Sequence, residues 1–138
     1  MKHENDRTPG DYDLVEAAKE LAGYTLRITS NEKNFPKRYR LSVVNKIQDM
    51  AVDILSCLIM AKELYPNTKM DYEQRLLYQK TALVKVRAMM TLIEVAADTF
   101  YVKAGTFEHW TGMAREVRNH TTAWIISDRK RFQRYEQS

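Results

Sequence analysis

Apolar residues recur at alternating steps of three and four through the middle of the chain, and this spacing constrains the fold more than any other feature. Between residues 44 and 65 it falls on Val44, Ile47, Ala51, Ile54, Leu58, Ala61 and Tyr65. Such steps place side chains on one face of an α-helix, and their sustained repeat is the heptad seam of packed helices. A half-buried strand would instead alternate at every second residue. The stretch is therefore predicted to be an amphipathic helix with one face in a core.

Three other stretches carry the same spacing. The third predicted helix has it at Leu76, Gln79, Leu83, Val86, Met90, Ile93, Ala97 and Phe100. The fourth has it at Phe107, Trp110, Ala114, Val117, Thr121, Trp124 and Asp128. The first has a weaker version at Leu14, Ala18, Leu21, Thr25 and Ile28. Only four glycines and three prolines occur in 138 residues, too few for the turns of an all-β or α/β chain.

Local signals give the helix limits. Pro36 suits the first turn of the second helix, and Pro66 ends it. Asp71 is a candidate N-cap of the third helix, Gly105 is placed just after its end, and Thr106 is placed to cap the fourth. The predicted fold class is an all-α, antiparallel, up-down-up-down four-helix bundle, because short connections make consecutive helices antiparallel neighbours. The predicted limits are a disordered leader over 1–10 and a single domain over 11–138, with helices over 11–30, 36–65, 71–103 and 106–134.

Several classes of protein are disfavoured. No run approaches eighteen apolar residues, so no membrane partner is expected, and the polar first residues do not resemble a secretory signal. The single cysteine, Cys57, cannot form an internal disulfide, which favours the reducing cytoplasm. The chain has no phosphate-binding glycine motif, no HExxH and no CxxC. We therefore expect a non-enzymatic protein without a cofactor.

A metal centre is also not expected. His109 and His120 are three helical turns apart, about 16 Å, which is too far to share an ion. Glu94 and Asp98 form an acidic pair, but the Glu-x-x-His repeat that would complete a di-metal site is missing. Cys57 lies in the most apolar stretch and is predicted to be a buried, inert thiol.

Basic residues gather at two places, although the formal net charge is only +4. Residues 1–26 carry a net charge of −3, whereas residues 27–40 carry +4. The first basic cluster consists of Lys33, Lys37, Arg38 and Arg40, and the second of Arg129, Lys130, Arg131 and Arg134. The predicted topology places the two clusters at opposite ends of the bundle, with Lys69 and Arg75 beside the second. Such ends would attract a polyanion.

Aromatic residues interleave with both clusters, at Tyr39, Phe132 and Tyr135. Sites for single-stranded nucleic acid use this mixture, because cations follow the phosphates while rings stack on bases. RNA or DNA is therefore the predicted partner. Two structural alternatives stay open: the cations complement helix C-termini, or arginine stems cover aromatic surface.

Specific residues carry a family resemblance over roughly 14–133. They are Asn34-Phe35-Pro36-Lys37-x-Tyr39-Arg40 at the start of the second helix, and Trp110, Trp124 and Ser127-Asp128-Arg129-Lys130-Arg131-Phe132 in the fourth. With these residues the chain resembles the four-helix-bundle family that includes the accessory variability proteins (Avd) of diversity-generating retroelements. Proteins encoded in intervening sequences of ribosomal RNA belong to the same family.

The resemblance implies a homopentameric barrel that binds a reverse transcriptase together with its template RNA or cDNA. It places Lys37, Arg38 and Arg40 at one mouth of the barrel, and Arg129, Lys130 and Arg131 at the other. The leading hypothesis is thus a non-enzymatic, nucleic-acid-binding scaffold. The alternative is a protein-interaction bundle whose basic ends dock an acidic partner and which has no direct role with nucleic acid.

Overall fold

The computed structural model describes residues 9–136, and all regular structure in this range is helical. The elements are α1 (Pro9–Thr29), a 3₁₀ turn η2 (Lys37–Tyr39), a π-helical turn η3 (Arg40–Val44), α2 (Asn45–Glu63), α3 (Lys69–Thr99), α4 (Ala104–Arg131) and the short α5 (Gln133–Glu136). The prediction of an all-α chain is confirmed over these residues. None of these helices combines the length and the apolarity needed to cross a bilayer. Most of the predicted leader, residues 1–8, lies outside the described range, whereas Pro9 and Gly10 open α1.

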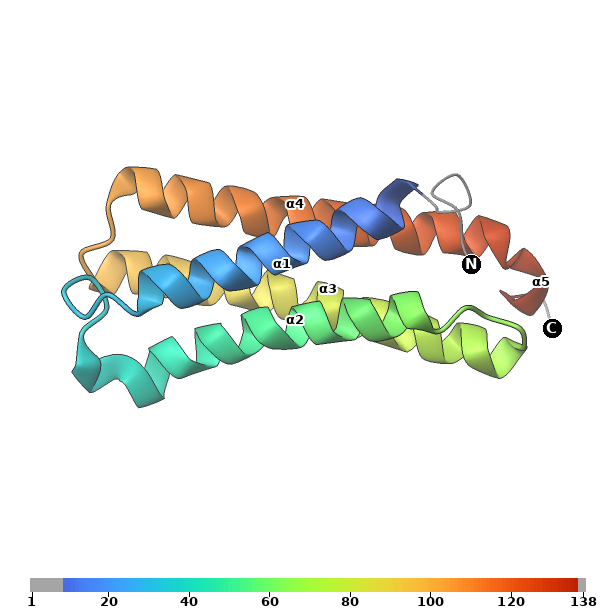
Figure 1. The fold of residues 1–138 in the computed structure, drawn as a ribbon, viewed down its shortest axis with the longest axis horizontal. Helices are drawn as coiled ribbons and strands as arrows, with labels where there is room; N and C mark the ends of the chain where they lie inside the picture. The colour runs from blue at the N-terminus through green and yellow to red at the C-terminus, as the bar shows by residue number, and fades with distance from the viewer. Residues whose placement is uncertain (1–8, 137–138) are drawn as a thin grey trace.

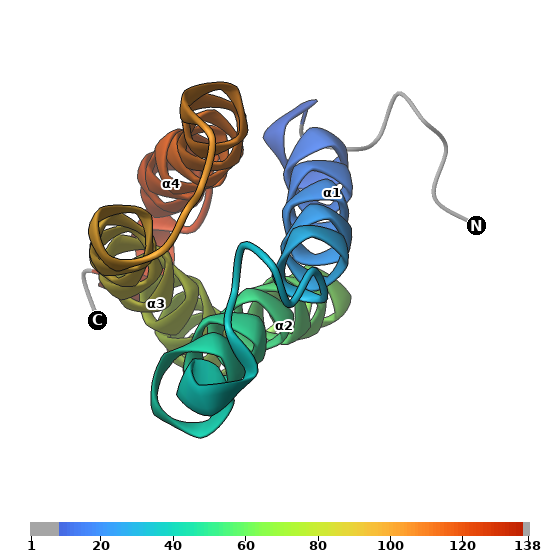
Figure 2. The ribbon, with the colours of Figure 1, turned by 90° about the vertical axis from the view of Figure 1, so that its left-hand side faces the viewer.

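Four long helices lie side by side, and each runs opposite to the one before it (Figure 1). Both α1 and α3 pack against α2 and α4, so the helices surround a common centre, as the end-on view shows (Figure 2). The α1–α2 and α3–α4 connections meet at one end of the bundle, and the α2–α3 connection lies with α5 at the other (Figure 1). We call these the α1–α2 end (residues 27–46 and 98–103) and the α2–α3 end (residues 62–75 and 128–136).

The predicted seams account for most of the core. In α2 and the turn before it, every predicted seam position except Tyr65 is buried. Tyr65 is half exposed because α2 ends at Glu63, two residues earlier. In α4, Trp110, Ala114 and Val117 are completely buried. The heptad spacing thus identified the faces of α2 and α4 correctly.

The seam predicted for the third helix is half wrong. Its positions 79, 86, 93 and 100 are buried as predicted, but 76, 83, 90 and 97 are only partly buried. The buried positions that complete the seam are Tyr72, Arg75, Ala82, Met89 and Ala96. The prediction was misled because bulky apolar residues lie one position beside the true seam. In addition, a buried arginine cannot be recognised as a core residue from its polarity.

Helix 2 starts less regularly than predicted. The chain winds first as η2 and then as the wider η3 before α2 begins at Asn45. Neither turn has a side-chain cap at its start. The irregular winding lies within the first basic cluster, and π-helical turns recur at functional sites.

Two cap predictions are corrected. The N-cap of α3 is Thr68, whose hydroxyl oxygen accepts the Asp71 backbone N–H at 3.1 Å, and Asp71 in turn accepts the Asn67 N–H at 3.1 Å. Asp71 therefore supports the cap from within the first turn. Gly105 and Thr106 belong to the first turn of α4, because α3 already ends at Thr99 and none of the described glycines needs a positive φ.

Candidate nucleic-acid interface

The first basic cluster lies on the connection from α1 to α2, and all four of its side chains are exposed. The connection is shaped locally: the Asn31 side chain accepts the Lys33 backbone N–H at 3.0 Å, and the Asn31 carbonyl accepts the Phe35 N–H at 2.8 Å. Pro36 then leads into η2. This folded loop presents Lys33 and Lys37 to solvent.

Aromatic packing fixes the connection to the bundle. Phe35 is 3% exposed, and its ring stands edge-on to Phe100 at 5.8 Å and to Trp110 at 5.9 Å between centroids. The Tyr39 ring lies 5.1 Å from the same Phe100. Tyr39 also lies under the Arg38 guanidinium, 5.0 Å from its centroid. The cluster therefore lies on a loop that is packed against the bundle. The Tyr39 ring packs against Phe100 and Arg38 and does not project into solvent, where a base could stack on it.

Most of this cluster is not neutralised by acids. Arg40 pairs with Glu32 at 3.0 Å, and both side chains are about half exposed. Among the described residues, no carboxylate lies within ion-pairing distance of Lys33, Lys37 or Arg38. Over the whole α1–α2 end, seven basic residues face two acidic ones. This end is therefore strongly basic.

The second basic cluster lies at the end of α4 and on α5, where Arg129, Lys130 and Arg134 are exposed and Arg131 is partly buried. Arg129 approaches Glu136 at 3.9 Å. The Arg134 guanidinium stacks 4.5 Å from the centroid of Tyr135. Several of these arginines thus contact a carboxylate or cover an aromatic ring.

The Arg131 side chain shows both kinds of contact. Its guanidinium lies 5.9 Å from the ring centroid of Tyr65 and 5.3 Å from that of Phe132. It also approaches the Asp128 carboxylate at 3.9 Å. The idea that arginine stems cover aromatic surface therefore describes this cluster well.

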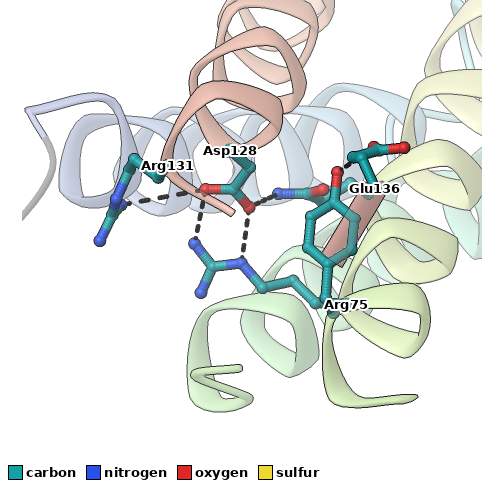
Figure 3. A network of polar contacts seen from close by, with 6 residues as sticks. Arg75, Asp128, Arg131 and Glu136 are labelled. Carbon is teal, nitrogen blue, oxygen red and sulfur yellow. Dashed lines mark hydrogen bonds and ion pairs between the residues drawn. The ribbon is translucent and has the colours of Figure 1, made fainter. Parts of the chain in front are cut away.

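Arg75 does not belong to the surface of this end, contrary to the prediction. Its side chain is 2% exposed and forms two hydrogen bonds to the fully buried Asp128 carboxylate, at 2.7 and 3.0 Å (Figure 3). Gln79 donates a third hydrogen bond to the same carboxylate at 2.8 Å. Arg75 and Asp128 neutralise each other, and the rest of the α2–α3 end (residues 62–75 and 128–136) has six basic residues against four acidic ones. Its basic excess of two is smaller than the excess of five at the α1–α2 end.

The same network holds α5 against the bundle. The Tyr72 hydroxyl donates to the Glu136 carboxylate, which Figure 3 shows close to the Arg75–Asp128 pair. Burial and the neighbouring Glu136 raise the pKa of Tyr72 well above its usual value. The residues shown in Figure 3 thus connect α3, α4 and α5 through hydrogen bonds and ion pairs.

The remaining candidates are structural. Cys57 is buried, and desolvation raises the pKa of its thiol, although Lys85 of the neighbouring helix opposes the shift. His109 stands edge-on to Tyr24 at 4.8 Å. Within residues 9–136, no three His, Cys, Asp or Glu side chains gather as a metal ion would require.

Two cations at the α1–α2 end were not among the predicted site residues. Arg27, at the end of α1, and Lys103, before α4, line one hollow together although 76 positions separate them in the chain. The +4 charge of residues 27–40 included Arg27, but nothing in the sequence pointed to Lys103.

Comparison of the chain with protein-family models, with curated proteins and with solved structures finds no match. The resemblance to the accessory variability family therefore stays a prediction from the residues quoted above.

Proposed function

We propose that this protein is a non-enzymatic accessory factor that binds RNA or DNA at the α1–α2 end. The observation that carries the proposal is the excess of basic residues there, seven against two, with Lys33, Lys37 and Arg38 exposed and without an acidic partner in the described range. Exposed cations on an anchored loop bind phosphates through counterion release. The α2–α3 end, with a basic excess of two and with arginines that already contact carboxylates or aromatic rings, is a secondary contact.

Self-association is part of the proposal. Met70, Leu77 and Val84 follow one another at steps of seven along α3 and are 79, 56 and 63% exposed. On a helix this spacing forms one stripe, and exposed apolar stripes mark contact surfaces. A ring of parallel subunits, which the family resemblance gives as a pentamer, would gather the α1–α2 ends into one basic rim. The resemblance also supplies the partner class, a reverse transcriptase with its template RNA or cDNA.

Fluorescence anisotropy with labelled single-stranded RNA, single-stranded DNA and duplex DNA tests nucleic-acid binding across 50–300 mM NaCl. The triple variant Lys33→Ala, Lys37→Ala, Arg38→Ala should weaken binding and make the log–log salt slope shallower by about 2 for single strands, at about 0.7 per lost phosphate contact. The matched control Arg129→Ala, Lys130→Ala, Arg134→Ala removes the same charge from the other end and should lose much less. Equal losses would contradict the choice of end, and a parent protein that binds no nucleic acid would favour the protein-interaction alternative.

Sedimentation velocity tests the assembly. Leu77→Glu with Val84→Glu should shift the protein to a monomer if the α3 stripe is the contact. The control Ile126→Glu places a charge on α4, at a side chain that is 51% exposed, and should leave the oligomer intact. A parent protein that sediments as a monomer at all concentrations would contradict this part of the proposal.

A further inference from the structure

A hollow of about 290 Å³ opens at the α1–α2 end, between the last turn of α1, the following loop and the start of α4. Its lining residues are Arg27, Ile28, Asn31, Asn34, Phe35, Val102, Lys103 and Thr106. The buried Phe35 ring belongs to the aromatic cluster that anchors the loop. The hollow is thus built on the same fixed loop that carries Lys33 and Lys37.

The chemistry of the lining suits an anion. Two cations, Arg27 and Lys103, line it and no carboxylate does. Among the described residues, neither cation has an acidic partner within 4 Å. The Arg27 guanidinium currently lies beside Gly23, since a Cβ there would be 3.2 Å from its Nη1. Binding of an anion in the hollow requires this exposed side chain to rotate away from Gly23.

Polar donors complete the lining. The Asn31 side-chain oxygen is engaged by the Lys33 N–H, which leaves the Asn31 NH₂ group to donate. Asn34 contributes a second amide and Thr106 a hydroxyl. Arginine and lysine with amide and hydroxyl donors form the usual set that binds phosphate oxygens.

Two other hollows have different chemistry. The one between α1 and α4 is lined by Glu16 and Glu20 as well as Lys19 and Arg27, so an anion would meet carboxylates there. Arg27 thus lies between two hollows, and only the one at the α1–α2 end has no carboxylate. The one on α3 is lined by Leu77 and Val84 of the apolar stripe together with Lys80, Thr81 and Lys85, and Lys85 is already paired with Asp53 at 2.9 Å. Among these three hollows, the one between Arg27 and Lys103 is thus the one with two cations that have no acidic partner in the described range and with no carboxylate in its lining.

We infer that this hollow binds the terminal phosphate of a nucleic-acid strand, an inference that rests on the proposed function. A terminal phosphomonoester carries close to two negative charges at neutral pH, against one for each internal phosphodiester, and so matches a site with two cations. A strand that starts in the hollow leaves it beside Lys33 and Lys37, which would then follow its backbone. The protein would thereby recognise strand ends rather than bind at random along a chain.

Anisotropy with three versions of one single-stranded oligonucleotide tests this inference: 5′-phosphorylated, 3′-phosphorylated, and hydroxyl at both ends. One phosphorylated version should bind the parent protein about ten-fold more tightly than the hydroxyl version, the effect of one or two charge-assisted hydrogen bonds. The variant Arg27→Gln, Lys103→Gln should lose this ratio, while the hydroxyl version still binds in a salt-dependent way, more weakly because two of the seven cations at this end are gone. The matched control Lys33→Gln, Lys37→Gln should weaken all versions and keep the ratio. Circular dichroism checks that each variant stays folded.

The possible failures are separable. Equal affinity of the parent for all three versions overturns the strand-end inference and leaves the proposed function standing. Absence of binding to any oligonucleotide overturns both. Inorganic phosphate is the remaining probe, and its effect is measured as the Tm of the parent and of Arg27→Gln, Lys103→Gln. Suppose that phosphate raises the Tm of the parent alone and that terminal phosphates give no advantage in oligonucleotide binding. The ligand is then free phosphate, and the inference about strand ends is wrong.

Discussion

Replacing Asp128 with asparagine should destabilise the protein more than any conservative surface change, because Asp128 is the only counter-charge for a buried guanidinium in the described network. The Arg75 side chain is 2% exposed and Asp128 is completely buried. Three N–H donors converge on this carboxylate, two from Arg75 and one from Gln79. Asparagine offers one acceptor oxygen to these three donors, and its own NH₂ group would face them. The charge of Arg75 would remain buried without compensation.

The magnitude follows from this geometry. Removing one partner of a buried ion pair costs about 3–5 kcal/mol, most of it the desolvation of the charge left behind. A domain of this kind has a free energy of unfolding of about 5–15 kcal/mol, so the variant would lose a large share of its stability. Replacing all three members of the network by apolar residues, Arg75→Met, Gln79→Leu and Asp128→Leu, removes the buried charge together with the Gln79 amide that would lose its acceptor, and should be roughly neutral or stabilising.

Urea unfolding followed by circular dichroism is the suitable assay, because urea does not screen charges as guanidinium chloride does. With an m-value of about 2 kcal/mol/M, the midpoint of Asp128→Asn should fall by about 1.5–2.5 M. The control is Asp53→Asn, which removes the carboxylate of the pair with Lys85 at 2.9 Å, where the two side chains are 49 and 35% exposed. An exposed pair contributes about 0.2–1 kcal/mol. All variants are compared at one protein concentration, since self-association would shift the midpoint.

Two results would refute the reasoning. If Asp128→Asn lost no more stability than Asp53→Asn, the Arg75 guanidinium would have found water or another acceptor. If the triple apolar variant were as unstable as Asp128→Asn, the loss would come from packing around residue 128 and not from an unpaired charge.

Three further outcomes are expected from urea unfolding. Thr25→Val should cost about 1–3 kcal/mol, because the buried Trp110 Nε1–H donates to the Thr25 hydroxyl at 2.9 Å and would lose its acceptor; a cost below about 0.5 kcal/mol would contradict this. Gly112→Ala should stabilise by about 0.5–1 kcal/mol, because a Cβ there meets nothing within 4 Å and alanine favours the helix, so a loss of stability would reveal a hidden contact. The pKa of Tyr72 is raised in the folded state, so the neutral phenol stabilises the fold. This contribution to the free energy of unfolding is complete below the ordinary tyrosine pKa of about 10 and is lost as the pH rises above that value. Tyr72→Phe should therefore show a shallower loss of stability than the parent between pH 9 and 11, and identical slopes would contradict the raised pKa that burial and Glu136 give Tyr72.

The fold could be predicted where apolar residues themselves mark the core. Ile47, Ile54 and Leu58 are large, apolar and regularly spaced, and all three are completely buried. The buried face of α3 was predicted wrongly in part, because two neighbouring sets of positions on this helix both carry apolar residues at the heptad spacing. Leu83 is more apolar than Ala82, yet Ala82 is buried and Leu83 is only partly buried. Hydrophobicity alone cannot show that a small residue lets two helices approach closely.

The candidate site was less predictable for a related reason. A lysine or arginine has the same appearance in the sequence whether it is exposed, paired or buried. Arg75 was expected at the surface, but its partner Asp128 lies 53 positions away on another helix. Such pairings depend on which helix faces touch, and the pattern along one helix does not contain this information. The first basic cluster was easier to locate, because the connection between two helices and the first turn of the second helix are exposed at the end of a bundle in almost any packing.

The arrangement of charge explains why a modest net charge is compatible with binding a polyanion. The α1–α2 end holds seven basic and two acidic residues, an excess of five, whereas the whole chain has a net charge of only +4. The remainder of the protein is therefore slightly acidic, and the molecule is electrostatically polar along its length. A polyanion would be drawn most strongly toward the α1–α2 end and less strongly toward the α2–α3 end, whose basic excess is two, so that orientation accompanies binding. If subunits assemble in parallel, each added copy strengthens the same rim, and affinity should rise more steeply with oligomer size than it would for charge spread evenly over the surface.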